Sequence, residues 1–169
     1  NRRASQPAAI RVGRAIHAID RPMQLIDADV HNYPADMGDL TPYLSRRWQA
    51  YVAQSGMKVP AASMYPKVFA AAARRDAWPP NGKQPGSDPD FARQQLLDEY
   101  NIDAAILNPL VAASSLHNRD LANALMRAVN EWTANDWCAV DARWRGSIAV
   151  NARDPATSAQ EIEHWAQDD

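Results

Sequence analysis

Three short apolar segments, each followed by residues with helical periodicity, place the strongest constraint on the fold of this chain. Strands that alternate with helices favour crossover connections and a parallel sheet. The 169 residues suffice for one domain with a sizeable core, so the predicted fold class is α/β. The sequence predicts strands over 25–31, 103–109 and 145–150, and helices over 39–54, 88–100, 119–139 and 156–167.

The first predicted strand carries two acids and a histidine at alternate positions. Asp27, Asp29 and His31 are spaced by two residues, so we expect them on one face, with the apolar residues between them on the other. Asp29 and His31 end the strand and are candidate metal ligands, because coordination to a cation offsets the cost of burying a carboxylate. The alternative is a strand end with solvated polar residues.

Composition limits the binding partners and the cellular compartment that we expect for this protein. The net charge of −2 and the pI near 6.1 give no reason to expect nucleic acid or an anionic membrane as a partner. A single cysteine, Cys138, excludes an internal disulfide and suits a reducing compartment, so the predicted location is cytoplasmic. No apolar run approaches the length of a membrane-spanning helix.

Two segments stand apart from the alternating pattern. Residues 1–24 hold five arginines and one acid and form a predicted basic N-terminal arm, which either wraps a neighbouring subunit or is a solvated tail. Residues 57–90 hold six prolines and no sustained period, which predicts a long irregular insertion after the first strand. Its aromatic residues, Tyr65, Phe69 and Trp78, favour an ordered lid over a linker.

Further polar residues are candidates for contact with a substrate. Asn108 ends the second predicted strand, where its amide either binds a substrate carboxylate or carbonyl or pins the turn before Pro109. His117 lies in the following loop and either contacts substrate or bonds to its own loop. The tryptophans at helical or helix-end spacing are expected to pack in the core: Trp132, Trp137 and Trp144.

Six short motifs follow one another along the chain: IDADVH (26–31), LTPYL (40–44), DAWPP (76–80), PGSDP (85–89), AILNPL (105–110) and RGSI (145–148). Together they resemble bacterial proteins of the amidohydrolase superfamily, in the branch of aminocarboxymuconate-semialdehyde decarboxylase and the resorcylate-type decarboxylases. The resemblance covers about residues 25–169 and implies the N-terminal portion of a metal-dependent (β/α)8 TIM barrel. The active site of such a barrel lies at the carboxyl ends of its strands, where Asp29 and His31 are expected.

The chain departs from the pattern of this branch in two ways. The usual first-strand motif has two histidines spaced by one residue; His31 matches the second, but Asp29 stands at the first. The resemblance implies a divalent metal, with zinc ranked first, and the carboxylate strengthens manganese, iron or magnesium as alternatives. Only three of eight strands are predicted, so we expect a second chain or a further C-terminal segment to complete the barrel, and an oligomer.

These expectations lead to one main functional hypothesis and its alternatives. The resemblance implies a metal-dependent hydrolase or non-oxidative decarboxylase that acts on a small organic acid or cyclic compound, with Asp29 and His31 as metal ligands. A non-catalytic or regulatory subunit that completes a partner's barrel is the alternative. A third reading is an inactive relative in which Asp29 marks the loss of the metal.

Overall fold

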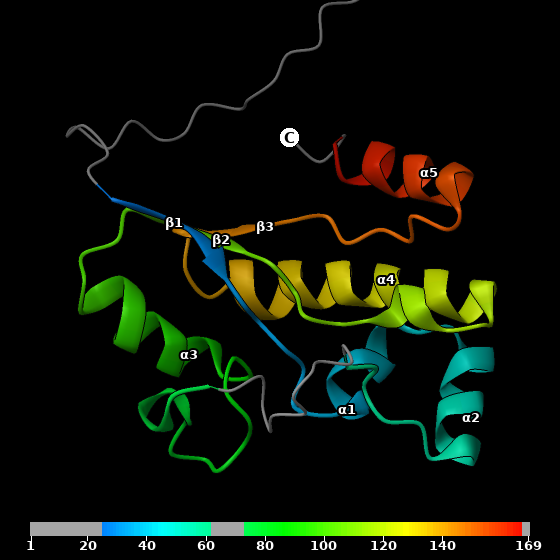
Figure 1. Cartoon of the computed structure of the whole chain (residues 1–169), viewed down its shortest axis with the longest axis horizontal. Helices are drawn as coiled ribbons and strands as arrows, with labels where there is room; N and C mark the ends of the chain where they lie inside the picture. The colour runs from blue at the N-terminus through cyan, green and yellow to red at the C-terminus, as the bar shows by residue number, and fades with distance from the viewer. Residues whose placement is uncertain (1–24, 62–72, 167–169) are drawn as a thin grey trace, which may run out of the picture.

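The computed structural model describes residues 25–61 and 73–166 (Figure 1). Three strands form one parallel sheet in the order β1 (Ile26–Val30), β2 (Ala104–Leu107) and β3 (Trp144–Gly146). This confirms the predicted α/β class and the parallel sheet. It is consistent with part of an amidohydrolase-type barrel.

Helices separate the strands, and several of them begin at a capping side chain. Asp88, Asn118 and Asp154 each accept a hydrogen bond from a backbone N–H of the first turn that follows. The α-helices are α1 (Met37–Leu40), α2 (Arg46–Ser55), α3 (Pro89–Ala92), α4 (Arg119–Trp132) and α5 (Pro155–Trp165). The 3-10 turns are η1 (Thr41–Tyr43), η3 (Arg75–Ala77) and η5 (Ala113–Ser115), and the π-helical segments are η4 (Arg93–Asp98) and η6 (Thr133–Cys138).

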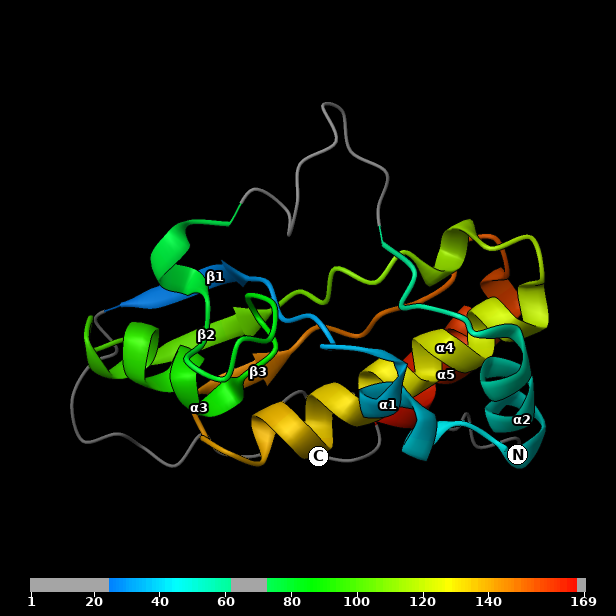
Figure 2. The same ribbon diagram turned by 90° about the horizontal axis from the view of Figure 1, so that it is seen from below.

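The sheet lies at one end of the molecule, and the chain that leaves each strand runs toward the other end. In Figure 1 the helices α1 to α4 lie below the strands, and α5 lies above the segment that follows β3. Figure 2 shows the strands at one end, α2 at the opposite end and α1 between them. The carboxyl ends of all three strands therefore face the middle of the molecule.

The core gathers around α4, which contacts α1, η1 and η5, and it continues through η6 to β3. Leu121, Leu125 and Val129 recur at helical spacing on α4 and are buried. The tryptophans predicted for the core are buried too: the Trp137 ring lies 5.7 Å from Trp144 and 6.1 Å from Trp132 between ring centroids, both in edge-to-face contact. This packing anchors β3 to the end of α4.

The helix predicted over 39–54 is divided into three pieces. Pro42 favours a helical start and lies in the first turn of η1, but Leu44 (ψ 150°) and Ser45 (ψ 155°) are extended before α2 begins. The Gln49 side-chain amide donates to the carbonyls of Thr41 and Leu44, at 3.2 and 2.8 Å, and so ties α2 to η1 across the extended residues between them. Gly56 ends α2 in the left-handed conformation, with φ 63°.

The third strand is shorter than the predicted 145–150 and begins one residue earlier. The Ser147 N–H donates to the Leu107 carbonyl at 2.9 Å, directly after the last paired residue. Beyond it, the buried Asn130 side chain of α4 donates to the Ala149 carbonyl at 2.9 Å and accepts from its N–H at 2.7 Å. Because a side-chain amide occupies these backbone groups, this part of the chain joins α4 instead of the sheet.

A bulge in β1 overturns part of the predicted alternation. Asp27 pairs with Ala105 and Val30 with Leu107, so β1 uses one more residue than β2 between these points. Paired residues share a face, which places Asp27 on the same side as Val30. Asp29 and His31 lie together, as predicted, but Asp27 does not share their face; its carboxylate accepts from the Asp29 N–H at 3.0 Å.

Several sequence predictions lie outside the described residues. These are the basic arm over 1–24 and the part of the proline-rich insertion that holds Tyr65 and Phe69. Of that insertion, residues 57–61 and 73–90 are described. Within the described ranges no helix is long and apolar enough to span a membrane.

Candidate metal centre

Four polar side chains meet where the three strands end. The His31 Nε2 lies 3.0 Å from the Asp29 Oδ1, and the Asn108 Nδ2 donates to the same carboxylate oxygen at 3.0 Å. The Ser147 hydroxyl donates to the Asn108 Oδ1 at 2.7 Å. The four residues thus form one chain of hydrogen bonds across neighbouring strands, and we call them the carboxyl-end cluster.

The strand ends place each member of the cluster. The Asn108 N–H donates to the Val30 carbonyl at 2.7 Å, directly beyond the last paired residues of β1 and β2. The Ser147 N–H binds the Leu107 carbonyl in the same way one strand further on. Because parallel strands end at one edge of a sheet, backbone pairing alone brings these residues together.

The orientation of Asn108 follows from its partners. Its Oδ1 accepts from the Ser147 hydroxyl, which leaves the amide nitrogen to face Asp29 and the Ala28 carbonyl, at 3.0 and 3.2 Å. Both ends of the side-chain amide are therefore engaged within the chain. Of the two roles considered for Asn108, this geometry favours fixing the strand end and the Asp29 carboxylate.

The cluster is open on the side of its two candidate ligands. The side chains of Asp29 and His31 are 74% and 45% exposed, so the cost of burying a carboxylate does not argue for a metal in this chain. The donor chemistry does fit a divalent cation, which accepts both imidazole nitrogen and carboxylate oxygen. Ligands about 2 Å from one ion lie roughly 3 Å apart, a spacing close to the 3.0 Å between the Asp29 and His31 donor atoms.

The described residues supply only part of a metal site. Over 25–61 and 73–166, no group of three or more His, Cys, Asp or Glu side chains is placed to hold a metal ion. Asp29 and His31 are thus a pair of donors, and a closed coordination shell requires ligands from elsewhere.

His117 lies apart from the cluster. It lines an open cavity of about 550 Å³ with Asn118, Arg119, Asp120 and Arg153, at the start of α4. Arg153 donates to the carbonyls of Ser114 and Leu116, which ties the end of the 147–153 segment to the loop before α4. None of the residues that line this cavity belongs to the carboxyl-end cluster, so a substrate contact by His117 stays a prediction.

Sequence reasoning missed two residues that shape the cluster. Ser147 was assigned to the interior of the third strand, and its position directly after a strand became visible only with the correct strand end. Asn32 follows His31 and is fully buried, with its Nδ2 donating to the Thr133 hydroxyl at 3.1 Å. The position of Asn32 next to a candidate ligand could have drawn attention to it. Its hydrogen bond to a residue 101 positions away could not be foreseen from the sequence.

Comparison with known protein families gives the chain a family. Residues 26–169 match the family model described as Amidohydrolase, which is most of the chain. The chain belongs to the amidohydrolase family. Members of this family are generally enzymes and typically use divalent metals, so a two-donor group at the strand ends suits an amidohydrolase. No curated protein matches the chain.

Proposed function

We propose that this amidohydrolase chain forms the metal-binding first part of a hydrolase or non-oxidative decarboxylase that acts on a small organic acid or cyclic compound. Asp29 and His31 hold the divalent metal, with zinc as the first choice and manganese or iron as alternatives. The observation that carries the proposal is the 3.0 Å separation of the Asp29 and His31 donor atoms at the carboxyl end of a parallel sheet. Active sites of (β/α)8 barrels lie at that end of the strands.

The residues of the carboxyl-end cluster have two different roles, metal binding and support of the ligands. A bound divalent metal supplies activation of water or polarisation of a substrate oxygen. His31 and Asp29 bind it through imidazole nitrogen and carboxylate oxygen. Asn108 holds the Asp29 carboxylate in place, and Ser147 holds Asn108. The exposed faces of Asp29 and His31 leave room for a substrate beside the metal.

We propose that further polypeptide completes the sheet. In the described residues β1 and β3 are the edge strands, and the side chains of Ile26 and Ile148 near them are 54% and 39% exposed. Unpaired parallel edges and exposed apolar residues favour covering strands, supplied by a C-terminal segment or a second chain. Native mass spectrometry of the protein as isolated from its source tests this. A lone monomer of 18.7 kDa would contradict it.

Metal titration tests the assignment of the ligands. We expect the complete protein, with the polypeptide that closes the barrel, to bind one Zn²⁺ or Mn²⁺ in isothermal titration calorimetry, and its His31→Ala variant to lose that binding. His164→Ala is the matched control, because His164 is also an exposed histidine but lies on α5. Equal metal affinity in the wild type and His31→Ala would overturn the proposal.

Product analysis decides between the two reaction classes. The substrate panel combines aromatic and unsaturated carboxylic acids with cyclic esters and amides. A decarboxylase releases carbon dioxide from the acids, whereas a hydrolase cleaves the esters or amides and incorporates oxygen from ¹⁸O-labelled water into its product. Release of carbon dioxide that disappears in His31→Ala would support the decarboxylase. Turnover that is unchanged in His31→Ala would contradict the metal-dependent mechanism for either class.

A further inference from the structure

The segment that follows β1 carries His31 and is tied to the proline-rich insertion. The Tyr33 N–H donates to the Gly86 carbonyl at 2.7 Å. The Gln84 side-chain amide donates to the carbonyls of Pro34 and Ala35, at 3.0 and 2.9 Å. A turn about fifty residues away in the sequence therefore lies directly against the chain that bears the candidate ligand.

Gly86 makes the closest approach in this contact. A Cβ atom at this position would lie 2.6 Å from the His31 carbonyl oxygen and 3.6 Å from the Tyr33 nitrogen. Gly86 also has φ 76°, in the left-handed region that glycine adopts most readily. The neighbour that a side chain would strike is backbone, so the steric conflict cannot be relieved by turning a flexible side chain.

The opposite side of the same segment is also held. Asn32 is fully buried and donates through its Nδ2 to Thr133, at the start of η6. The Leu110 N–H donates to the Asn32 carbonyl at 3.2 Å. Because Asn32 is anchored on the core side, a push on the His31 carbonyl is expected to rotate the His31 peptide and shift its imidazole.

We propose that Gly86 is a positioning residue for His31: the turn 84–86 clamps the ligand-bearing segment against the core and sets the direction of the imidazole. This inference rests on the proposed function only in taking His31 as a metal ligand. The last turn of the proline-rich insertion accordingly supports the candidate metal centre.

The test compares two glycines of the same turn region. Gly82 has φ 75°, almost the same as Gly86, but a Cβ added there meets no atom within 4 Å. Gly82→Ala and Gly86→Ala therefore carry the same backbone strain, and only Gly86→Ala strikes His31. We expect Gly86→Ala to weaken Zn²⁺ or Mn²⁺ binding by roughly tenfold or more, as for loss of an outer-shell support. Gly82→Ala is expected to bind as the wild type does.

A second readout does not depend on metal. In metal-free protein, the ¹H–¹³C resonances of the His31 imidazole are expected to shift in Gly86→Ala and to stay in place in Gly82→Ala. If the wild-type protein binds no metal, the proposed function is overturned. The contact between Gly86 and His31 can still be tested by comparing the His31 resonances of the two variants. Wild-type binding together with equal affinity and equal resonances in both variants would overturn the clamp alone.

A gentler variant covers the case in which Gly86→Ala does not fold. Gln84→Ala removes the two hydrogen bonds to Pro34 and Ala35 without backbone strain. Gln49→Ala is its matched control, because the Gln49 amide also donates to two backbone carbonyls, at the junction before α2. We expect a loss of metal affinity of a few-fold in Gln84→Ala and none in Gln49→Ala. Equal affinities in these two variants would contradict the clamp.

Discussion

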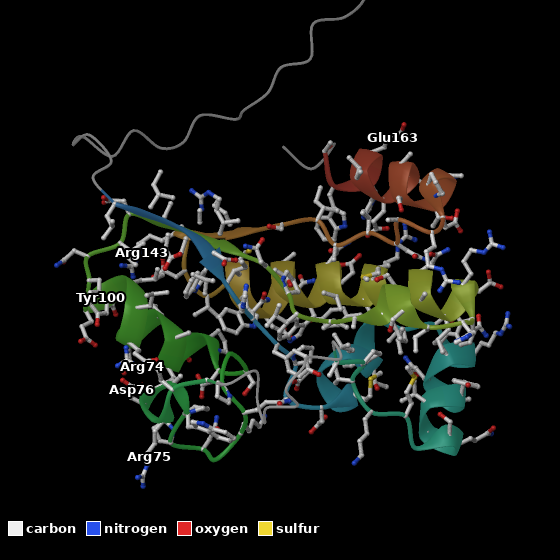
Figure 3. All side chains as sticks on the ribbon, in the orientation of Figure 1. Arg74, Arg75, Asp76, Tyr100, Arg143 and Glu163 are labelled. Carbon is white, nitrogen blue, oxygen red and sulfur yellow. The ribbon has the colours of Figure 1, made fainter. Side chains whose placement is uncertain are left out.

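Both ends of the parallel sheet carry carboxylates, but two at the amino end are paired with an arginine, whereas one at the carboxyl end is exposed. At the amino end, Arg143 pairs with Asp98 at 2.6 Å and with Asp141 at 2.7 Å, and these side chains are 17–42% exposed (Figure 3). At the carboxyl end, the Asp29 side chain is 74% exposed, and within the described residues its carboxylate contacts the His31 imidazole and the neutral Asn108 amide. A carboxylate that is hydrogen-bonded to a guanidinium has its negative charge neutralised and contributes to the stability of the fold. The Asp29 carboxylate has no such partner among the described residues and can still bind a cation.

This contrast matches the division of labour in barrel folds. Groups at the amino ends of the strands serve stability, and groups at the carboxyl ends serve chemistry. Arg143 immediately precedes β3 and Ser147 immediately follows it, so the short strand Trp144–Gly146 separates a stability network from the candidate site. Variants at the two ends should therefore affect different measurements.

Asp29→Ala is expected to have the largest effect. Loss of an outer-shell residue costs a metal site about 10- to 100-fold in affinity, so loss of a direct ligand should exceed about 100-fold. Because Asp29 is exposed, the free energy of unfolding of the metal-free protein should change by less than about 0.5 kcal/mol. Calorimetric metal titration and urea denaturation measure the two quantities. A large loss of stability without a loss of metal affinity would contradict the proposal that Asp29 serves metal binding and not the stability of the fold.

Arg143→Ala should show the opposite pattern. The guanidinium donates to both Asp98 and Asp141, and its removal should lower the free energy of unfolding by about 1–3 kcal/mol. Metal affinity should stay within about twofold of the wild type, because the variant leaves the carboxyl-end cluster untouched. Arg75→Ala, which removes an exposed arginine from η3, controls for the change in net charge.

The same network predicts how stability depends on pH. Hydrogen bonds from the Arg143 side chain, and to a lesser extent from its backbone N–H, hold the pKa of Asp141 below its ordinary value against the opposing effect of burial. Asp141 therefore binds a proton more readily in the unfolded chain, and the stability it contributes above about pH 4 is lost as the pH falls through its folded-state pKa. Arg143→Ala should lose less stability on acidification than the wild type. Equal losses in denaturant titrations from pH 6 to pH 3 would contradict this.

Ser147→Ala should have the smallest effect. It removes the hydroxyl that orients Asn108, so the amide can turn away from Asp29, and we expect a few-fold loss of metal affinity. Ser115→Ala is the control, because the Ser115 hydroxyl also donates a single hydrogen bond, to the Ala112 carbonyl in η5. Unchanged metal affinity in Ser147→Ala would show that Ser147 does not support metal binding through Asn108.

Much of the fold follows from local sequence signals. The parallel sheet, the helices that begin near residues 88, 119 and 156, and the tryptophan core were all predicted correctly. These features depend on periodicity and on residues three or four positions apart. The helix over 39–54 and the end of the third strand were wrong, because side chains of Gln49 and Asn130 replace regular backbone pairing there.

The candidate site was predictable only in part. Asp29 and His31 were placed together from their spacing, although the bulge moved Asp27 to the other face. Asn108 was found as a residue after a strand, but its contact with Asp29 was not. His117 was expected at the same end of the sheet, and the structure places it in a separate cavity at the start of α4.

The sequence by itself determined that this chain is α/β, that its strands run parallel, and that two donor side chains end the first strand. Only the tertiary structure decided that Ser147 and Asn108 support Asp29, and that Gly86 lies against the His31 carbonyl. The physical reason is the range of the interactions. Strands, helices and caps are selected by neighbours along the chain, whereas the support of a ligand comes from backbone and side chains that only packing brings into contact.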